Sequence, residues 1–142
     1  MNIEKKVAVY GTLRADQPLA HVWRESATSS VGIVTGFGLV VREDCEFPVA
    51  KWTGKQDDLI VVDILSFRKE SVFKRVVSEM DRIEGHPLLF RRQKVTAVRH
   101  KDSKEIGCWM YVGADPRMFY NGAILEDGDW SEFVTGLPTV FE

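Results

Sequence analysis

The sequence predicts an α+β fold built on a mostly antiparallel sheet that curls towards a barrel. Roughly six β-rich segments accompany only one strongly amphipathic helical segment. The strands do not alternate regularly with helices, which disfavours a doubly wound parallel sheet. The length of 142 residues suits a single domain spanning residues 1–142.

The first part of the chain has strand and turn signals in close succession. Residues 7–10 are a short apolar run that ends at a glycine, as expected of a buried strand. Residues 11–14 then form a predicted tight turn, and 19–25 a predicted short helix. Residues 31–41 are β-rich but interrupted by glycines, which indicates bends or close backbone approach.

In the middle of the chain, two predicted strands are followed by a segment with the apolar spacing of a helix. Residues 47–52 and 59–67 are predicted strands joined by a turn at 53–58. Apolar residues within 68–84 recur every three or four positions, which predicts an amphipathic helix. Gly85 and Pro87 follow as stop signals.

The last part returns to strand. Residues 88–98 and 106–113 are predicted strands with a polar turn at 101–104. After Pro116 the chain contains Gly122, Gly128 and Gly136, and we expect an irregular tail.

Composition narrows the function classes. Apolar residues make up 44% and charged residues 28%, as in ordinary globular domains, and the formal net charge is −2. This charge offers no electrostatic case for nucleic acid. No run approaches membrane-spanning length and no signal-like segment opens the chain, so we expect no membrane partner and a cytoplasmic location.

Cysteine and histidine give no metal pattern. Cys45 and Cys108 form no CxxC pair and are interpreted as buried or incidental thiols. The histidines show no metal-ligand spacing, so no metal and no cofactor is expected. A nucleophile and base made of Cys108 and His86 is conceivable, but nothing in the sequence places them together.

The first candidate site is the turn that contains Tyr10, Gly11, Thr12, Leu13 and Arg14. An apolar strand that runs into a glycine turn can direct successive backbone N–H groups at one point. Such a nest binds a carboxylate or a developing oxyanion. The alternative is an ordinary turn after a core strand.

The second candidate lies at the end of the predicted helix. Asp81 and Glu84 are three residues apart and can share one helix face. Glu84 stands directly before the glycine stop, where the helix dipole disfavours a negative charge, so structure alone gives little reason for it. The alternative is an exposed acid at a frayed end. His86 fits a surface or capping residue.

A third segment, Gly128-Asp129-Trp130, favours a structural role. Its Trp can cover an edge of the core and its Asp can bond nearby backbone.

Taken in order, these segments resemble the γ-glutamylcyclotransferase-like (AIG2-like) family. Its members open with Tyr-Gly-Ser/Thr-Leu, here residues 10–13, and continue with a Leu-Asp-x-x-Glu-Gly helix end, here 80–85. A Pro and a Tyr-x-Arg strand follow, here Pro87 and 90–92. Many members close with Gly-Asp-Trp, here 128–130, and residues 47–50 resemble a Tyr-Pro-Ala stretch. The motif pattern is closest to γ-glutamylamine cyclotransferases.

The resemblance implies a small, mixed β-barrel with flanking helices and a pocket between the turn and the Glu. It implies that a γ-glutamyl compound cyclises to 5-oxoproline and releases an amine, with Glu84 as general acid and base. The resemblance assigns substrate binding to Phe90 and to the turn residues 10–14 named above. Two positions depart from the pattern: Met80 replaces Leu, and Phe90 replaces Tyr and so lacks a hydroxyl.

Two other functions fit the same resemblance. One is a non-catalytic member that binds a small ligand in the pocket. The other is an enzyme of this fold that acts on a different small amide or modified metabolite. The sequence specifies neither the leaving amine nor the oligomeric state.

Overall fold

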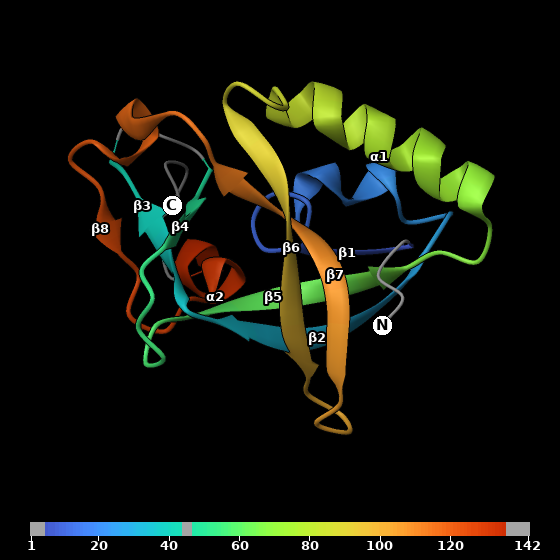
Figure 1. Ribbon diagram of the computed structural model, residues 1–142, viewed down its shortest axis with the longest axis horizontal. Coiled ribbons are helices and arrows are strands. Elements are labelled where there is room, and N and C mark those ends of the chain that lie inside the picture. Colours follow the sequence, from blue (N-terminus) through green and yellow to red (C-terminus); the bar gives the residue numbers. More distant parts are fainter. Residues whose placement is uncertain (1–4, 44–46, 136–142) are drawn as a thin grey trace.

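The computed structural model describes residues 5–43 and 47–135. Cys45 and Gly136, which the sequence analysis mentions, lie outside these residues. The elements, labelled in Figure 1 with the exception of two short 3-10 helices η1 and η2, are β1 (Lys6–Val9), η1 (Pro18–Val22), β2 (Thr28–Thr35), β3 (Phe37–Val41), β4 (Val49–Trp52), β5 (Leu59–Ser66), α1 (Glu70–Glu84), β6 (Phe90–Arg99), β7 (Glu105–Gly113), η2 (Pro116–Phe119), β8 (Ala123–Ile124) and α2 (Trp130–Thr135).

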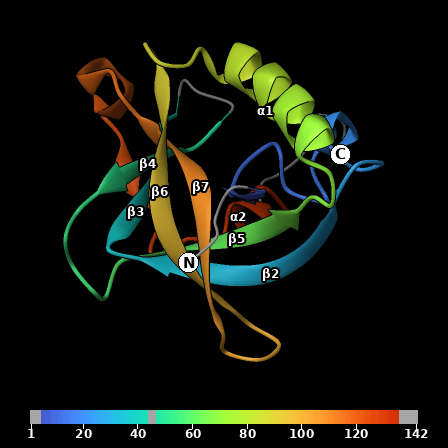
Figure 2. The ribbon, with the colours of Figure 1, turned by 45° about the vertical axis from the view of Figure 1, so that its right-hand side comes forward.

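Five strands close into a barrel in the order β1-β5-β2-β6-β7. All neighbouring pairs are antiparallel except β1 and β7, which run parallel with Val7 opposite Trp109 and Ala8 opposite Met110. The β6–β7 hairpin crosses the long β2–β5 pair in Figures 1 and 2. The α+β class and the mixed, mostly antiparallel barrel are therefore confirmed.

A second sheet in the order β4-β3-β8 stands beside the barrel. The β-rich stretch 31–41 is thus divided: β2 belongs to the barrel, β3 belongs to the small sheet, and Gly36 separates them. The tail after Pro116 is more regular than predicted, because it contains η2, β8 and α2. These elements have two to six residues each, too few for a hydrophobic period to appear.

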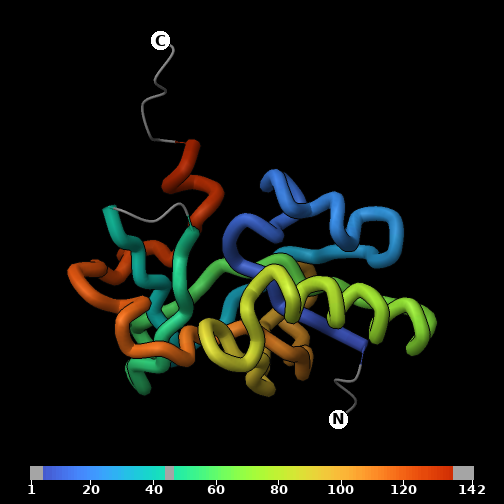
Figure 3. Tube along the Cα trace, turned by 90° about the horizontal axis from the view of Figure 1, so that it is seen from above, coloured from blue at the N-terminus to red at the C-terminus, as the bar shows by residue number. Residues whose placement is uncertain are grey.

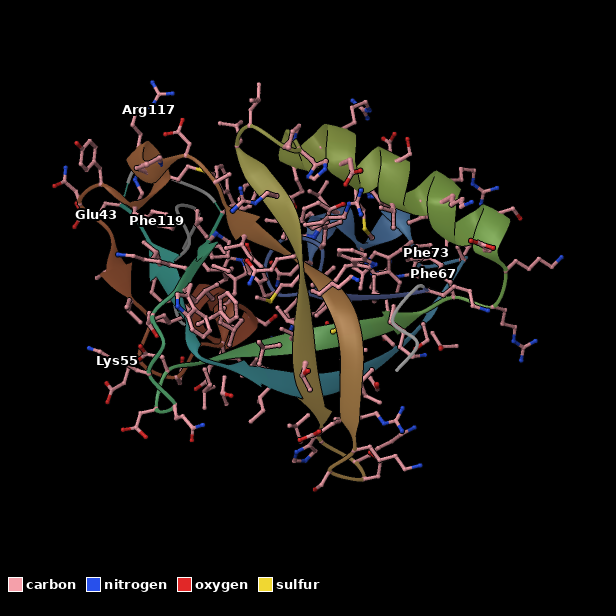
Figure 4. All side chains as sticks on the ribbon, viewed as in Figure 1. Glu43, Lys55, Phe67, Phe73, Arg117 and Phe119 are labelled. Atoms are coloured by element: carbon pink, nitrogen blue, oxygen red, sulfur yellow. The ribbon has the colours of Figure 1, made fainter. Side chains whose placement is uncertain are left out.

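Helix α1 packs its apolar face against the barrel. Val76, Val77 and Met80 are buried on that face. Phe73 contacts Phe67, the residue after β5, edge to face with 5.5 Å between ring centroids, and Figure 4 shows both side chains beneath the helix. The helix begins two residues later than predicted and ends, as predicted, at Glu84.

The predicted helix 19–25 is instead the short 3-10 helix η1, which contacts α1. Seen from above, this early segment lies next to α1 (Figure 3), and Ser131 of α2 donates a 2.8 Å hydrogen bond to Asp16, just before η1. The apolar residues form two clusters. One lies between the barrel, α1 and η1, and the other fills the barrel and continues to the small sheet and α2.

The alternation along β1 explains this division. Val7 and Val9 belong to the first cluster, whereas Ala8 and Tyr10 belong to the second. The strand is buried on both faces, so its sequence is a continuous apolar run. Within the described residues, no helix has the length and apolar character needed to cross a membrane.

Candidate active site

A pocket lies where the end of β1, the end of α1 and the start of β6 meet. We call it the inner pocket. It brings together the candidate residues Glu84, Tyr10, Gly11, Thr12, Leu13 and Phe90, although they come from distant parts of the sequence. Its remaining wall consists of Ala8, Val9, Phe47, Pro48 and Tyr111.

The turn after β1 is held through its carbonyl groups. The oxygens of Gly11, Thr12 and Leu13 accept hydrogen bonds from Arg14 N (3.0 Å), Leu19 N (2.9 Å) and Trp23 Nε1 (2.7 Å), respectively. Among the described residues, nothing accepts a hydrogen bond from the three N–H groups of the same turn residues. These N–H groups thus have no partner within the described part of the chain, and the residues that carry them line the pocket, as an anion-binding nest requires.

The residues around this turn are fixed by close packing. A Cβ atom on Gly11 would lie 2.8 Å from Cγ of Pro48, so a side chain does not fit there without a shift. The Tyr10 hydroxyl donates to the Tyr111 carbonyl (2.8 Å) and accepts from Ala50 N (3.1 Å), which ties β1 to β7 and β4. Burial, together with the nearby Glu84 charge, raises the pKa of Tyr10 far above its ordinary value.

Glu84 is the last residue of α1 and extends into the inner pocket. The helix stops there because Gly85 adopts a left-handed conformation (φ 65°), while His86 N donates to the Asp81 carbonyl at 2.9 Å. No described residue forms a hydrogen bond or ion pair with the Glu84 carboxylate. Burial alone raises the pKa of Glu84 from 4.5 to about 7.

Asp81, which the sequence places on the same helix face as Glu84, supports the pocket wall. It accepts hydrogen bonds from the Tyr111 hydroxyl (2.6 Å) and from Nε (2.8 Å) and Nη2 (3.1 Å) of Arg92. His86 accepts a hydrogen bond from Arg92 N at 3.3 Å through Nδ1 and does not line the inner pocket. No hydrogen bond joins His86 to Glu84 within the part of the chain that the structure describes.

Arg14 lies outside the inner pocket. Its guanidinium is buried and paired with Asp63 (3.2 Å from Nε) and Asp129 (2.9 Å from Nη1). Asp129 also accepts from Glu132 N at 3.1 Å, and Trp130 is buried in the second cluster. The segment 128–130 thus has the structural contacts that the sequence analysis attributes to it.

The thiol of Cys108 is fully buried inside the barrel, and burial raises its pKa to about 12. It lies in the cluster that fills the barrel and does not line the inner pocket. Among the described residues, no group of His, Cys, Asp and Glu side chains could hold a metal ion.

The sequence analysis does not identify Tyr111 as a pocket residue. All three residues from Met110 to Val112 are buried, so alternation along β7 gives no signal for the one that reaches the pocket. The sequence points to Phe47 and Pro48 only through the stretch 47–50, which resembles the family's Tyr-Pro-Ala motif.

Comparison with known proteins agrees with this architecture. The family described as "Gamma-glutamyl cyclotransferase, AIG2-like" matches residues 7–132. No curated protein matches the chain. Among solved structures, an AIG2-like protein from Mus musculus has a TM-score of 0.67 and 17% identity, with 86% of each chain covered.

Two further structures have similar folds. An uncharacterized protein from Pyrococcus horikoshii has a TM-score of 0.63 and 21% identity, with 92% of this chain and 93% of that chain covered. An allophanate hydrolase from Kluyveromyces lactis has a TM-score of 0.68 and 12% identity, with 94% of this chain but only 21% of the hydrolase covered. At these identities the likeness concerns the fold.

Proposed function

The chain belongs to the gamma-glutamyl cyclotransferase, AIG2-like family, and from this membership and the pocket geometry we propose that it is a γ-glutamylamine cyclotransferase-type enzyme. Its products are 5-oxoproline and a free amine. The observation that carries this proposal is a largely buried Glu84 carboxylate with a pKa of about 7, in a pocket lined also by the turn. Within residues 5–43 and 47–135, neither the carboxylate nor the three N–H groups of the turn have a hydrogen-bond partner.

In the proposed reaction the substrate supplies its own nucleophile. Its α-amino nitrogen attacks its γ-carbonyl carbon, which forms the ring C–N bond of 5-oxoproline. The bond between that carbon and the amide nitrogen then breaks, and the amine leaves. Holding both ends of one molecule in attack geometry greatly accelerates the cyclisation, since effective molarities for well-oriented intramolecular reactions reach about 10⁵–10⁸ M.

Glu84 moves the proton that this reaction displaces. As a carboxylate it takes a proton from the α-ammonium group, and as a carboxylic acid it gives that proton to the departing nitrogen. The ring nitrogen then loses its second proton to the regenerated carboxylate, which passes it to the released amine. A pKa of about 7 suits both steps at neutral pH, because neither protonation state is rare.

The turn provides the complementary charge stabilisation. Negative charge develops on the γ-carbonyl oxygen as the nucleophile adds, and the N–H groups of Gly11, Thr12 and Leu13 are available as donors. These donors are backbone groups of a turn fixed by its carbonyls, so they need no reorganisation when the charge appears.

The test is 5-oxoproline release by the purified full chain from a panel of γ-glutamyl amines. We expect Glu84→Gln to lower turnover by about 10²–10⁴-fold, the usual contribution of general acid–base catalysis, while keeping the fold. Glu79→Gln is the matched control, because Glu79 is on the same helix but exposed and paired with Arg82. No release by the parent protein, or full activity in a folded Glu84→Gln protein, would refute the proposal.

A further inference from the structure

A second cavity, which we call the outer cleft, opens from the inner pocket. It measures about 560 Å³. The two share Thr12, Phe47, Glu84 and Phe90, so Glu84 lies at the junction between them. The rest of the outer cleft is formed by Gln17, Pro18, Leu19, Ile83, Leu89, Met118, Trp130 and Val134.

The lining of the outer cleft is mostly apolar. Glu84 is the only ionisable side chain among the described residues that line the outer cleft, and Thr12 and Gln17 are the only other polar ones. The indole Nε1 of Trp130 is buried and has no hydrogen-bond partner within the described part of the chain. An apolar lining with few polar groups is typical of a site for an apolar ligand.

We propose that the outer cleft is the subsite for the leaving amine and that it selects amines with an uncharged, apolar alkyl or aryl substituent. This inference rests on the proposed function. Glu84 returns the proton to the departing nitrogen, so that nitrogen lies next to Glu84 in the productive complex. The substituent on the nitrogen then extends into the space that continues past Glu84, which is the outer cleft.

The same lining disfavours an amine that carries a carboxylate, such as an amino acid. In the outer cleft this carboxylate has no cation among the described lining residues, and the one ionisable residue of that lining is the acidic Glu84. Burial without a partner opposes the charged form, and a like charge nearby opposes it further.

The experiment compares two series of synthetic substrates with the full chain. One consists of γ-glutamyl n-alkyl amides from ethyl to hexyl, and the other has the same chains ending in a carboxylate. We expect kcat/KM to rise roughly two- to fourfold with each added methylene in the first series. The carboxylate forms should be at least about 30-fold poorer at equal length.

Leu89→Lys tests the location of the subsite, since Leu89 lines the outer cleft but is about half exposed and tolerates a long polar side chain. We expect the ratio of kcat/KM for the carboxylate series to kcat/KM for the alkyl series to be at least tenfold higher in Leu89→Lys than in the parent. Leu88→Lys is the matched control, because Leu88 is adjacent, 80% exposed and absent from the lining, and its preference should equal the parent's.

The outcomes separate the two proposals. If no substrate in either series yields 5-oxoproline, the proposed function is overturned. If 5-oxoproline is released but kcat/KM does not depend on chain length, or favours the carboxylate series in the parent protein, only the subsite is overturned. The same holds if Leu88→Lys and Leu89→Lys change the preference equally. The parent's preference decides the question even if Leu89→Lys proves unstable.

Discussion

The hydroxyl of Tyr111 donates a 2.6 Å hydrogen bond to Asp81, a residue that lies three positions before Glu84 in the same helix. Because Arg92 binds the same carboxylate through two nitrogens, Asp81 connects strands β6 and β7 to the end of α1. One wall of the inner pocket is thereby held at a fixed distance from the helix that carries Glu84.

We therefore expect Tyr111→Phe to lower the free energy of unfolding by about 1.5–3 kcal/mol, the usual range for a hydrogen bond to a charged group. Turnover should fall about tenfold, because small displacements of a catalytic group are costly. A double-mutant cycle with Asp81→Asn measures the coupling. Asp102→Asn, which breaks a similar but exposed pair with Arg99, should leave turnover unchanged. Additive effects of Tyr111→Phe and Asp81→Asn would contradict the connection.

Glu84 makes the stability of the protein depend on pH in an unusual direction. Its pKa is raised in the folded state, from 4.5 to about 7, so its contribution to stability is full below pH 4.5 and is lost as the pH rises through 7. We expect Glu84→Gln to be more stable than the parent at pH 8, by on the order of 3 kcal/mol. At pH 4 the two should unfold at the same denaturant concentration. If the stabilities of the parent and of Glu84→Gln differed by the same amount at pH 4 and pH 8, the pKa of Glu84 would not be shifted.

The same ionisation should control the rate. Since the carboxylate form begins the proposed reaction, kcat/KM for a γ-glutamyl amine is expected to rise with pH through about 7 and then level off. The measurement is a pH–rate profile below the titration range of the substrate's own ammonium group. A profile that stays flat from pH 5 to pH 8 would remove Glu84 as the base.

Gly11 is tested by a substitution and its rescue. In Gly11→Ala the new methyl group meets the Pro48 ring, so we expect a loss of about 1–3 kcal/mol of stability and a displaced turn with lower turnover. Adding Pro48→Ala removes the ring and should recover much of both. A rescue of stability without activity would show that the turn geometry depends on more than this contact.

Replacing Arg14 tests whether this residue has a structural role or binds substrate. Its replacement by Met leaves Asp63 buried without its cation, and breaking a buried pair in this way costs about 3–5 kcal/mol. Because Arg14 does not line the inner pocket, KM should be unchanged in the fraction that folds. Arg117→Met, which breaks an exposed pair with Asp115, serves as the control for both measurements. A rise in KM without a loss of stability would show that Arg14 binds substrate.

The sequence predicts well the elements that carry a strong local pattern and predicts the others poorly. The 3.6-residue period of α1 and the apolar runs of β1, β5 and β7 are strong local signals. The six residues of α2 and the two of β8 are stabilised by contacts with distant segments, which leave no period in the sequence. The split of residues 31–41 between two sheets likewise depends on partners elsewhere in the chain.

The candidate site shows the same division. Ordered motifs point to Glu84 and to the turn that contains Gly11, because each is a local feature of one segment. The same turn includes Arg14, but only the fold reveals that its guanidinium is used by Asp63 and Asp129. Tyr111 lines the pocket, and its hydroxyl is held by a hydrogen bond to Asp81 in α1. This contact joins two elements, so neither segment of the sequence predicts it alone.

The parallel pairing of β1 with β7 has a consequence for biosynthesis. Because the first strand of the barrel closes against its last, no ribosome-bound chain can complete the barrel until residues near Met110 have emerged. The turn that follows β1 must wait with it, although it is made before the other strands of the barrel. Nascent chains from which β7 has not yet emerged should therefore leave β1 accessible to proteases, and chains that expose β7 should protect β1 in a single step.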